Sequence, residues 1–237
     1  MKQTKKNTKR ILQALFLLPI LSFTFLFSIA CTACDPPFSR LGHLVSELRD
    51  NIFIGTSDSF SVSIITGRRE DPFIMDGVVG ETRDFTLITL TPLTDTCGNF
   101  SFEVTIGGTQ FKGDFLAHPF SNTISAEIQA RALQTEIALT IKCSSGTQES
   151  LFAKSVLTEQ MICAEEALKI AENKLRYSLE TIKVNGELQA EIYIRLMANP
   201  IDNSGGYHWY VAFVASRDII FAVLIEPISM QVVAIRN

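Results

Sequence analysis

The residues best suited to acid–base or nucleophilic chemistry are three histidines that stand far apart: His43, His118 and His208. A zinc protease places two histidines in H-E-x-x-H, and a hydrolase elbow reads G-x-S-x-G; the sequence contains neither motif. It also contains no glycine-rich phosphate-binding motif. We therefore expect the histidines to be structural, and we predict no catalytic residue, no metal site and no cofactor.

Two pairs of adjacent acidic residues, Glu70-Asp71 and Glu165-Glu166, are the next candidates for acid–base chemistry. Neighbouring side chains point apart on a strand and diverge by about 100° on a helix, so neither pair can share a proton across a substrate. We expect all four carboxylates to be solvated.

Cys31 and Cys34 close an uncharged run, residues 11–33, that follows a basic stretch with five Lys and Arg residues. A basic start followed by an apolar segment is typical of an export signal. These five residues are a large part of the 21 basic residues, so the remaining chain carries 16 basic and 25 acidic residues, a balance of −9. Such an acidic body argues against a nucleic-acid partner.

The stretch Phe27-Ser28-Ile29-Ala30-Cys31 resembles the lipobox of bacterial lipoprotein signals, in which a small residue precedes a lipidated cysteine. The resemblance implies cleavage after residue 30 and a lipid on Cys31, with Cys34 as the alternative. Acyl chains would hold the body on the extracytoplasmic face of the cell membrane. An ordinary cleaved signal and an uncleaved single-span anchor are the alternatives, and both also place the body outside the cytoplasm.

The remaining cysteines are Cys97, Cys143 and Cys163. An exported protein permits disulfides, and Cys97 precedes one strand-like run while Cys143 ends another. A Cys97–Cys143 disulfide and isolated, half-buried thiols are both compatible with the sequence.

Apolar and polar residues alternate through much of residues 52–157, a pattern typical of strands with one buried face. The clearest run, residues 99–106, reads NFSFEVTI. We predict an antiparallel β-sandwich-like domain here. Before it, residues 31–51 are expected to form a tether and a short amphipathic helix, because Leu41, Leu44, Val45 and Leu48 have helical spacing.

Residues 158–237 are predicted to begin with a helix of about five turns capped by Thr158 and to continue as an antiparallel meander. The expected fold class is therefore α+β, with the β-sandwich-like domain followed by a helix-plus-meander domain.

The last third of the chain resembles the PepSY-like modules of exported bacterial proteins. The resemblance rests on the helix CAEEALKIAENKL, on WYVAF at residues 209–213 and on VLIEPISMQVVAI at residues 223–235. Glu226 stands at the acidic position of the family's final hairpin and Ser229 near its hydroxyl position. Met230 replaces a glycine that serves a turn position with positive φ, so either the turn differs or only the structure is similar.

Aromatic residues gather at residues 205–210, GGYHWY, which contain the chain's one tryptophan. We expect Trp209 to pack the C-terminal core against Leu168 and Leu175, and Tyr207 and His208 to rim a partner site, because aromatic residues are enriched at binding hot spots.

These features predict a membrane-anchored extracytoplasmic lipoprotein with a non-enzymatic binding or regulatory role. The expected partners are the membrane, through the N-terminal lipid, and another envelope protein. An envelope hydrolase with a site assembled from sequence-distant residues and a structural envelope component are the alternatives. A continuous apolar edge would favour binding, and a histidine within hydrogen-bond reach of a serine or carboxylate in a deep pocket would favour the hydrolase.

Overall fold

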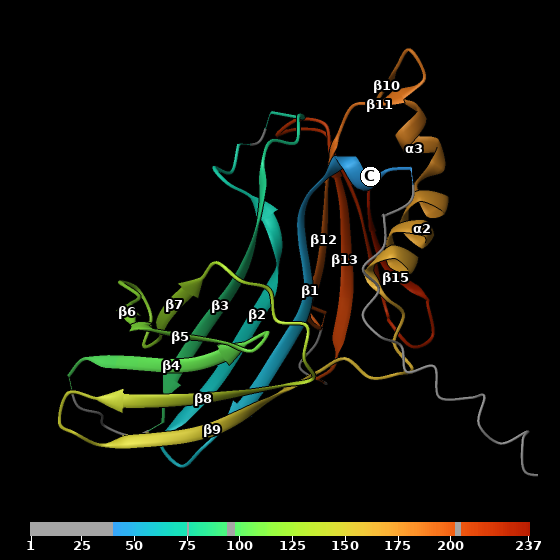
Figure 1. The fold of residues 1–237 in the computed structure, drawn as a ribbon. Coiled ribbons are helices and arrows are strands. Elements are labelled where there is room, and N and C mark those ends of the chain that lie inside the picture. The colour runs from blue at the N-terminus through green and yellow to red at the C-terminus, as the bar shows by residue number, and fades with distance from the viewer. Residues whose placement is uncertain (1–39, 75, 94–97, 202–204) are drawn as a thin grey trace, which may run out of the picture. The chain divides into compact units, whose positions relative to one another are not determined.

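The computed structural model describes residues 40–74, 76–93, 98–201 and 205–237, all within one compact unit, Asp35–Asn237. Of the described residues 53% are in strands and 10% in helices. Thirteen strands belong to one continuous sheet (Figure 1). The predicted α+β fold, with a β-sandwich-like domain followed by a separate helix-plus-meander domain, is therefore wrong: the protein is mostly β, and one sheet runs through both regions.

Strand β1 (Val45–Thr56) is the branch point of the sheet. Along one side it pairs with β2 (Phe60–Glu70) in antiparallel register. On the other side its first residues pair in parallel with β12 (Glu191–Ala198), and Phe53 and Ile54 pair with β9 (Gln148–Ser155). A single strand thus belongs to both halves of the structure, which is why the chain does not divide into two independent sheets.

The first half of the sheet grows from both sides of β1. Beyond β2 lie β3 (Thr82–Pro92), β7 (Ile124–Ile128) and β6 (Leu116–Ala117); beyond β9 lie β8 (Glu136–Cys143), β4 (Phe100–Ile106) and β5 (Thr109–Asp114). The two branches curl toward each other until β5 contacts β7, which leaves a nearly closed, barrel-like sheet. Its interior is apolar and includes Phe53, Ile64, Ile88, Leu139 and Ala153.

The second half is a meander in chain order, from β12 through β13 (Tyr207–Val214) and β14 (Ile220–Ile225) to β15 (Val232–Arg236). Helix α2 (Ala164–Lys174) packs on one face, and α3 (Arg176–Glu180) continues it (Figure 1). A small hairpin of β10 (Lys183–Val184) and β11 (Glu187–Leu188) follows α3. As predicted, Trp209 is buried in the same core as Leu168 and Leu175, and its Nε1–H donates to the carbonyl oxygen of Ile162 at 2.9 Å.

The short helix expected within residues 31–51 is wrong. Only Gly42–Leu44 form a 3-10 turn, η1, and β1 starts at Val45. Two irregularities shift the register of β1, between Val45 and Glu47 and between Arg49 and Asn51. The bulge between Val45 and Glu47 breaks the two-residue alternation of the strand. Together with the 3-10 turn before it, this bulge gives the apolar residues from Leu41 to Leu48 a spacing that imitates that of a helix.

Helix α2 begins later than predicted, because its N-cap is Cys163 and not Thr158. The N–H of Cys163 donates to the Glu166 carboxylate at 3.0 Å in a capping box, whereas Thr158 lies in a turn before the helix. The carboxylate of Glu166 thus satisfies an amide that the first helical turn leaves unpaired. In the described part of the chain, no helix is long and apolar enough to cross a membrane.

Candidate functional site

The turn that joins β14 to β15, residues 226–231, is organised by one carboxylate. Glu226 Oε2 accepts hydrogen bonds from the N–H groups of Ser229 at 2.5 Å and Ile228 at 3.2 Å. The backbone closes the turn through Met230 N–H to Glu226 O at 3.0 Å and Glu226 N–H to Gln231 O at 2.9 Å. Partial burial acts to raise the pKa of Glu226, but the hydrogen bonds from Ser229 and Ile228 outweigh it and lower that pKa.

Met230, in the same turn, has a left-handed backbone conformation. Its φ is +62°, in the left-handed region that disfavours a side chain. The side chain of Met230 is nevertheless 53% exposed, so no core packing explains why a long side chain occupies a strained position.

An apolar surface continues from this turn along β15. Among the described strands, β15 pairs only with β14 and is an edge of the sheet. Its exposed apolar residues, together with those of the turn, are Ile228, Met230, Val233 and Ile235, with exposed fractions of 42–53%. We call these four residues and the free side of β15 the edge surface. An uncovered apolar edge strand offers unpaired backbone donors and acceptors next to apolar side chains, which is the requirement for adding a strand from another chain.

Tyr207 and His208, the predicted rim of a partner site, lie at the beginning of β13, beside the turn. The pairing of Trp209 with Ile225 brings this strand end next to Glu226, and the charge of His208 contributes to the low pKa of Glu226. His208 itself is only 8% exposed, and its buried Nδ1 has no hydrogen-bond partner. Tyr207 is half-buried against the core, and burial raises its pKa. The structure thus brings the start of β13 next to the turn that precedes β15, but it leaves little of His208 to contact a partner.

The other two histidines do not form part of this surface. His43 is exposed in η1, and His118 is exposed and accepts the N–H of Phe120 at 3.3 Å. Among the described residues, no histidine hydrogen-bonds to a serine or a carboxylate, and no group of three His, Cys, Asp or Glu residues could hold a metal.

Cys31, Cys34 and Cys97 lie outside the described residues. Cys143, at the end of β8, is disulfide-bonded, and Cys163, half-buried at the start of α2, is a free thiol. The pairing of Cys143 with Cys97 stays a prediction.

Three buried glutamates form a polar cluster that the sequence did not reveal: Glu47, Glu70 and Glu191. The prediction that Glu70 is solvated is wrong, because its side chain accepts hydrogen bonds from Ser46 Oγ at 2.8 Å and Gly80 N–H at 2.9 Å. We predicted that Glu70 is solvated because it stands beside Asp71 in the sequence. Asp71 itself is exposed, as predicted. A glutamate at the end of a strand gives no sequence signal that the loop after it will fold back over its side chain.

Glu191 is completely buried and receives three hydrogen bonds. Two come from the backbone N–H groups of Gly77 at 2.7 Å and Asp76 at 3.0 Å, and the third comes from Tyr193 Oη at 2.5 Å. Glu191 therefore fastens the loop between β2 and β3 onto the start of β12, and Glu70 holds the same loop to the end of β2. We call residues 71–74 and 76–81 the clasped loop.

Glu47, on the neighbouring strand β1, lies between two arginines. Arg49 Nε donates to Oε1 at 2.5 Å, and Arg195 Nε donates to Oε2 at 2.6 Å. The Arg195 guanidinium also lies over the ring of Tyr193, 5.1 Å from its centroid. Each buried carboxylate of the cluster is thus hydrogen-bonded, and that of Glu47 also pairs with two basic side chains, which offsets the cost of burying charge.

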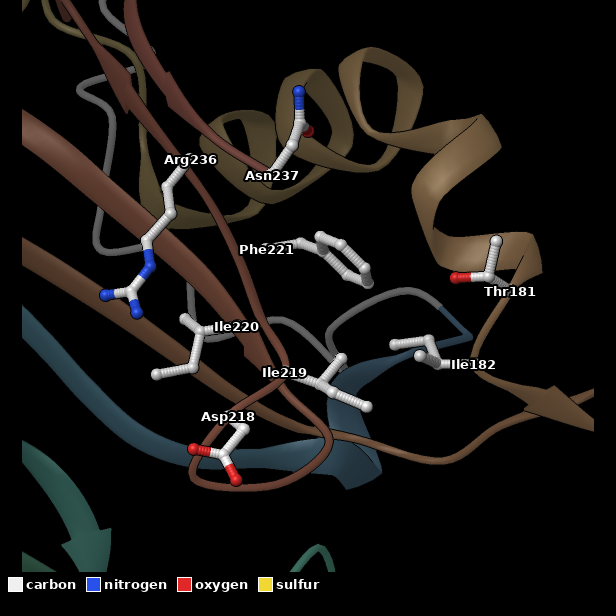
Figure 2. Close-up of a pocket in the computed structure, with 8 residues that line it drawn as sticks. All are labelled: Thr181, Ile182, Asp218, Ile219, Ile220, Phe221, Arg236 and Asn237. Carbon is white, nitrogen blue, oxygen red and sulfur yellow. The ribbon is translucent and has the colours of Figure 1, made fainter.

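A pocket lies near the clasped loop, where the β13–β14 turn, the end of α3 and the end of β15 meet. Figure 2 shows the apolar side chains of Ile182, Ile219 and Phe221 turned toward one another, with Asp218 and Arg236 at the margin. Its polar groups do not converge on one point and suggest no specific chemistry.

Comparisons with known proteins do not assign the chain to a family: no family model, no curated protein and no solved structure matches it.

Proposed function

We propose that this protein is an exported, lipid-anchored lipoprotein that binds or regulates another envelope protein at the extracytoplasmic face of the membrane, without catalysing a reaction. The observation that carries the proposal is the edge surface, where exposed apolar side chains accompany an unpaired strand. A partner would contribute an extended segment that pairs with the free side of β15.

Strand addition suits the chemistry of this edge. Main-chain hydrogen bonds supply affinity for any extended segment, while pockets and side chains on alternate positions select the sequence. Natural edge strands are commonly protected by charges, and β15 has only Arg236, at its last position. The turn held by Glu226 fixes the start of the strand, which lowers the entropy lost when a partner segment is ordered against it.

The anchor in this proposal is a lipid on Cys31, with Cys34 as the alternative. The lipobox-like stretch supports it, and so does the basic, then apolar, N-terminal sequence. The PepSY-like resemblance of the C-terminal region supports a binding or inhibitory role, and the left-handed Met230 agrees with the turn of that pattern.

Site-specific photo-crosslinking in the native envelope tests the binding role. A photoreactive residue at Val233 or Ile235 should form an adduct with a defined partner, whereas one at Phe152 should not. Phe152 is 62% exposed, and its strand β9 is paired on both sides, so it is a matched control. Adding the charge of Val233→Lys to the edge should abolish the adduct at Ile235. Equal adducts from Phe152 and β15, or none from β15, would refute the role of the edge.

Fatty-acid labelling tests the anchor separately. The wild-type chain should incorporate the labelled fatty acid, and the Cys31→Ala variant should not. If Cys34 is the acceptor instead, the Cys34→Ala variant should be the one that fails to incorporate the label. Labelling that persists in the double variant would exclude both cysteines.

A further inference from the structure

A second exposed apolar group lies at the opposite end of the meander from the edge turn. Because β1 and β12 are parallel, they start at the same end, where β13 ends and β14 begins. At this end the clasped loop exposes Phe73, Ile74 and Val78, by 51–69% of their surface, and the β13–β14 turn exposes Ile219 by 44%. A Cβ added to Gly77 would lie 3.5 Å from the carbonyl oxygen of Ala215, so the loop and the turn are neighbours. We call these four side chains the apolar patch.

The clasped loop is held in a way that keeps these side chains at the surface. Glu191 binds the N–H groups of Asp76 and Gly77, and Glu70 binds that of Gly80. The contact at Gly80 is so close that a Cβ there would be 2.7 Å from Glu70 Oε1. Phe73 rests on the ring of Tyr193, with centroids 6.1 Å apart, and remains 53% exposed. A loop fastened through its backbone cannot turn its apolar side chains inward without releasing two buried carboxylates.

The chain enters the described structure at this same end. Arg40 comes five residues before β1 and pairs at 3.4 Å with Glu172, which lies in the last turn of α2. Arg40 lies nine positions after Cys31 and six after Cys34. An extended chain of nine residues reaches at most about 30 Å. A lipid on either cysteine would therefore keep this end of the protein close to the bilayer.

We propose that the apolar patch is a second membrane contact, which inserts Phe73, Ile74 and Val78 into the interfacial zone of the bilayer beside the lipid anchor. This inference rests on the anchor of the proposed function. Stable attachment generally takes two signals, and a short acylated tether with an apolar loop at its root provides both. The patch thereby sets the orientation of the protein as well as strengthening its attachment.

The charges around the patch define the kind of surface it prefers. The clasped loop carries Asp71, Asp76 and Glu81, and only Asp71 has a basic partner, Arg83 at 3.3 Å, among the ion pairs of the described residues. An acidic loop is repelled by anionic headgroups. The contact should therefore depend on apolar insertion into zwitterionic lipid, with little dependence on salt.

This orientation would direct the edge surface away from the membrane. The β14 strand between the two ends has six residues, which corresponds to roughly 20 Å. A protein docked through the patch would thus present β15 and its turn to the space beyond the membrane, where an envelope partner could reach them.

The test uses the full-length lipidated protein in phosphatidylcholine vesicles that contain brominated acyl chains. Ile74→Trp places a tryptophan, whose fluorescence bromine quenches, in the apolar patch, and Ile228→Trp places one at the edge turn. These two positions are 51% and 49% exposed. The native Trp209 is 1% exposed and supplies the same background in both variants. Val78→Trp is a second probe of the patch, and the thermal midpoint of each variant checks that it folds.

We expect brominated lipid to quench the added tryptophan of Ile74→Trp and Val78→Trp at least about twofold more than that of Ile228→Trp, with a blue-shifted emission. Replacing a third of the lipid with phosphatidylglycerol should not increase the quenching. Equal quenching at all three positions, or stronger quenching at residue 228, would overturn the proposal. Fatty-acid content measured on the same samples separates the two failures: a chain without lipid refutes the anchor, whereas a lipidated chain whose probes at positions 74 and 78 stay unquenched refutes the patch alone.

Discussion

The hydroxyl of Tyr193 donates a 2.5 Å hydrogen bond to Oε2 of Glu191, two residues earlier on the same strand. Both side chains lie on the face of β12 that is opposite to α2, and both are buried. Burial, followed by the bond to Glu191, raises the pKa of Tyr193, so the phenol keeps its proton at neutral pH and remains a donor. Tyr193 thereby orients the carboxylate that fastens the clasped loop.

Tyr193→Phe should destabilise the protein by about 1.5–3 kcal/mol, because a hydrogen bond to a buried charged group is lost while the ring packing on Phe73 is kept. Urea unfolding measures this change. Tyr210→Phe on the adjacent strand is the matched control, since the Tyr210 hydroxyl has no hydrogen bond among the described residues. Equal losses in the two variants would mean that the Tyr193–Glu191 bond does not stabilise the loop.

The sequence predicted the individual strands better than their assembly. Alternation located β2, β3, β4, β8 and the meander, because each has one face in an apolar core. It did not show that β1 pairs with β2, β9 and β12, since pairing partners far apart in the chain leave no local pattern. The predicted fold class is wrong because this pairing of β1 joins the two regions into one sheet.

Gly67 shows how a local signal can mislead. Together with the polar residues that follow it, this glycine indicates a turn, yet it lies inside β2, where an added Cβ would be 1.8 Å from the carbonyl oxygen of Leu48. The glycine permits close approach of β1 near its bulge rather than a change of chain direction. Similarly, the buried role of Glu70 depends on Ser46 and Gly80, which only the folded chain brings together.

Met230→Gly should stabilise the protein by about 1 kcal/mol, because glycine adopts a left-handed conformation without the penalty that a side chain incurs. Differential scanning calorimetry would show a raised Tm. Met230→Ala is the control: it removes the same exposed side chain beyond Cβ but keeps the strain, and it should not stabilise. If Met230 contributes to partner binding, both variants should also weaken the crosslinked adduct at Val233. A loss of stability in Met230→Gly would contradict the prediction that the backbone of Met230 is strained.

Cys97 should be the disulfide partner of Cys143. Phe100 pairs with Cys143, and the N–H of Ser144 donates to Asn99 at 3.0 Å, so the residues just before β4 run beside the end of β8. Mapping of unreduced peptides should find Cys97 linked to Cys143 and Cys163 free to alkylate. Cys143→Ser should cost about 2–4 kcal/mol, whereas Cys163→Ser at a free thiol should cost far less. Alkylation of Cys97 in the unreduced protein would refute the pairing.

Stability should fall in acid partly through Glu226. Its pKa is lowered in the folded protein, so its contribution is fully present above the unfolded value of about 4.5 and is lost as the pH falls through the folded value below it. Glu226→Gln should therefore destabilise the protein by up to about 1 kcal/mol at pH 7, a modest effect because solvent screens this partly exposed turn, and by progressively less below pH 4.5. Urea unfolding between pH 3 and pH 7 measures the difference, with the exposed Glu187→Gln as the control. A destabilisation by Glu226→Gln that stays constant across this range would show that the charge of Glu226 does not hold the turn.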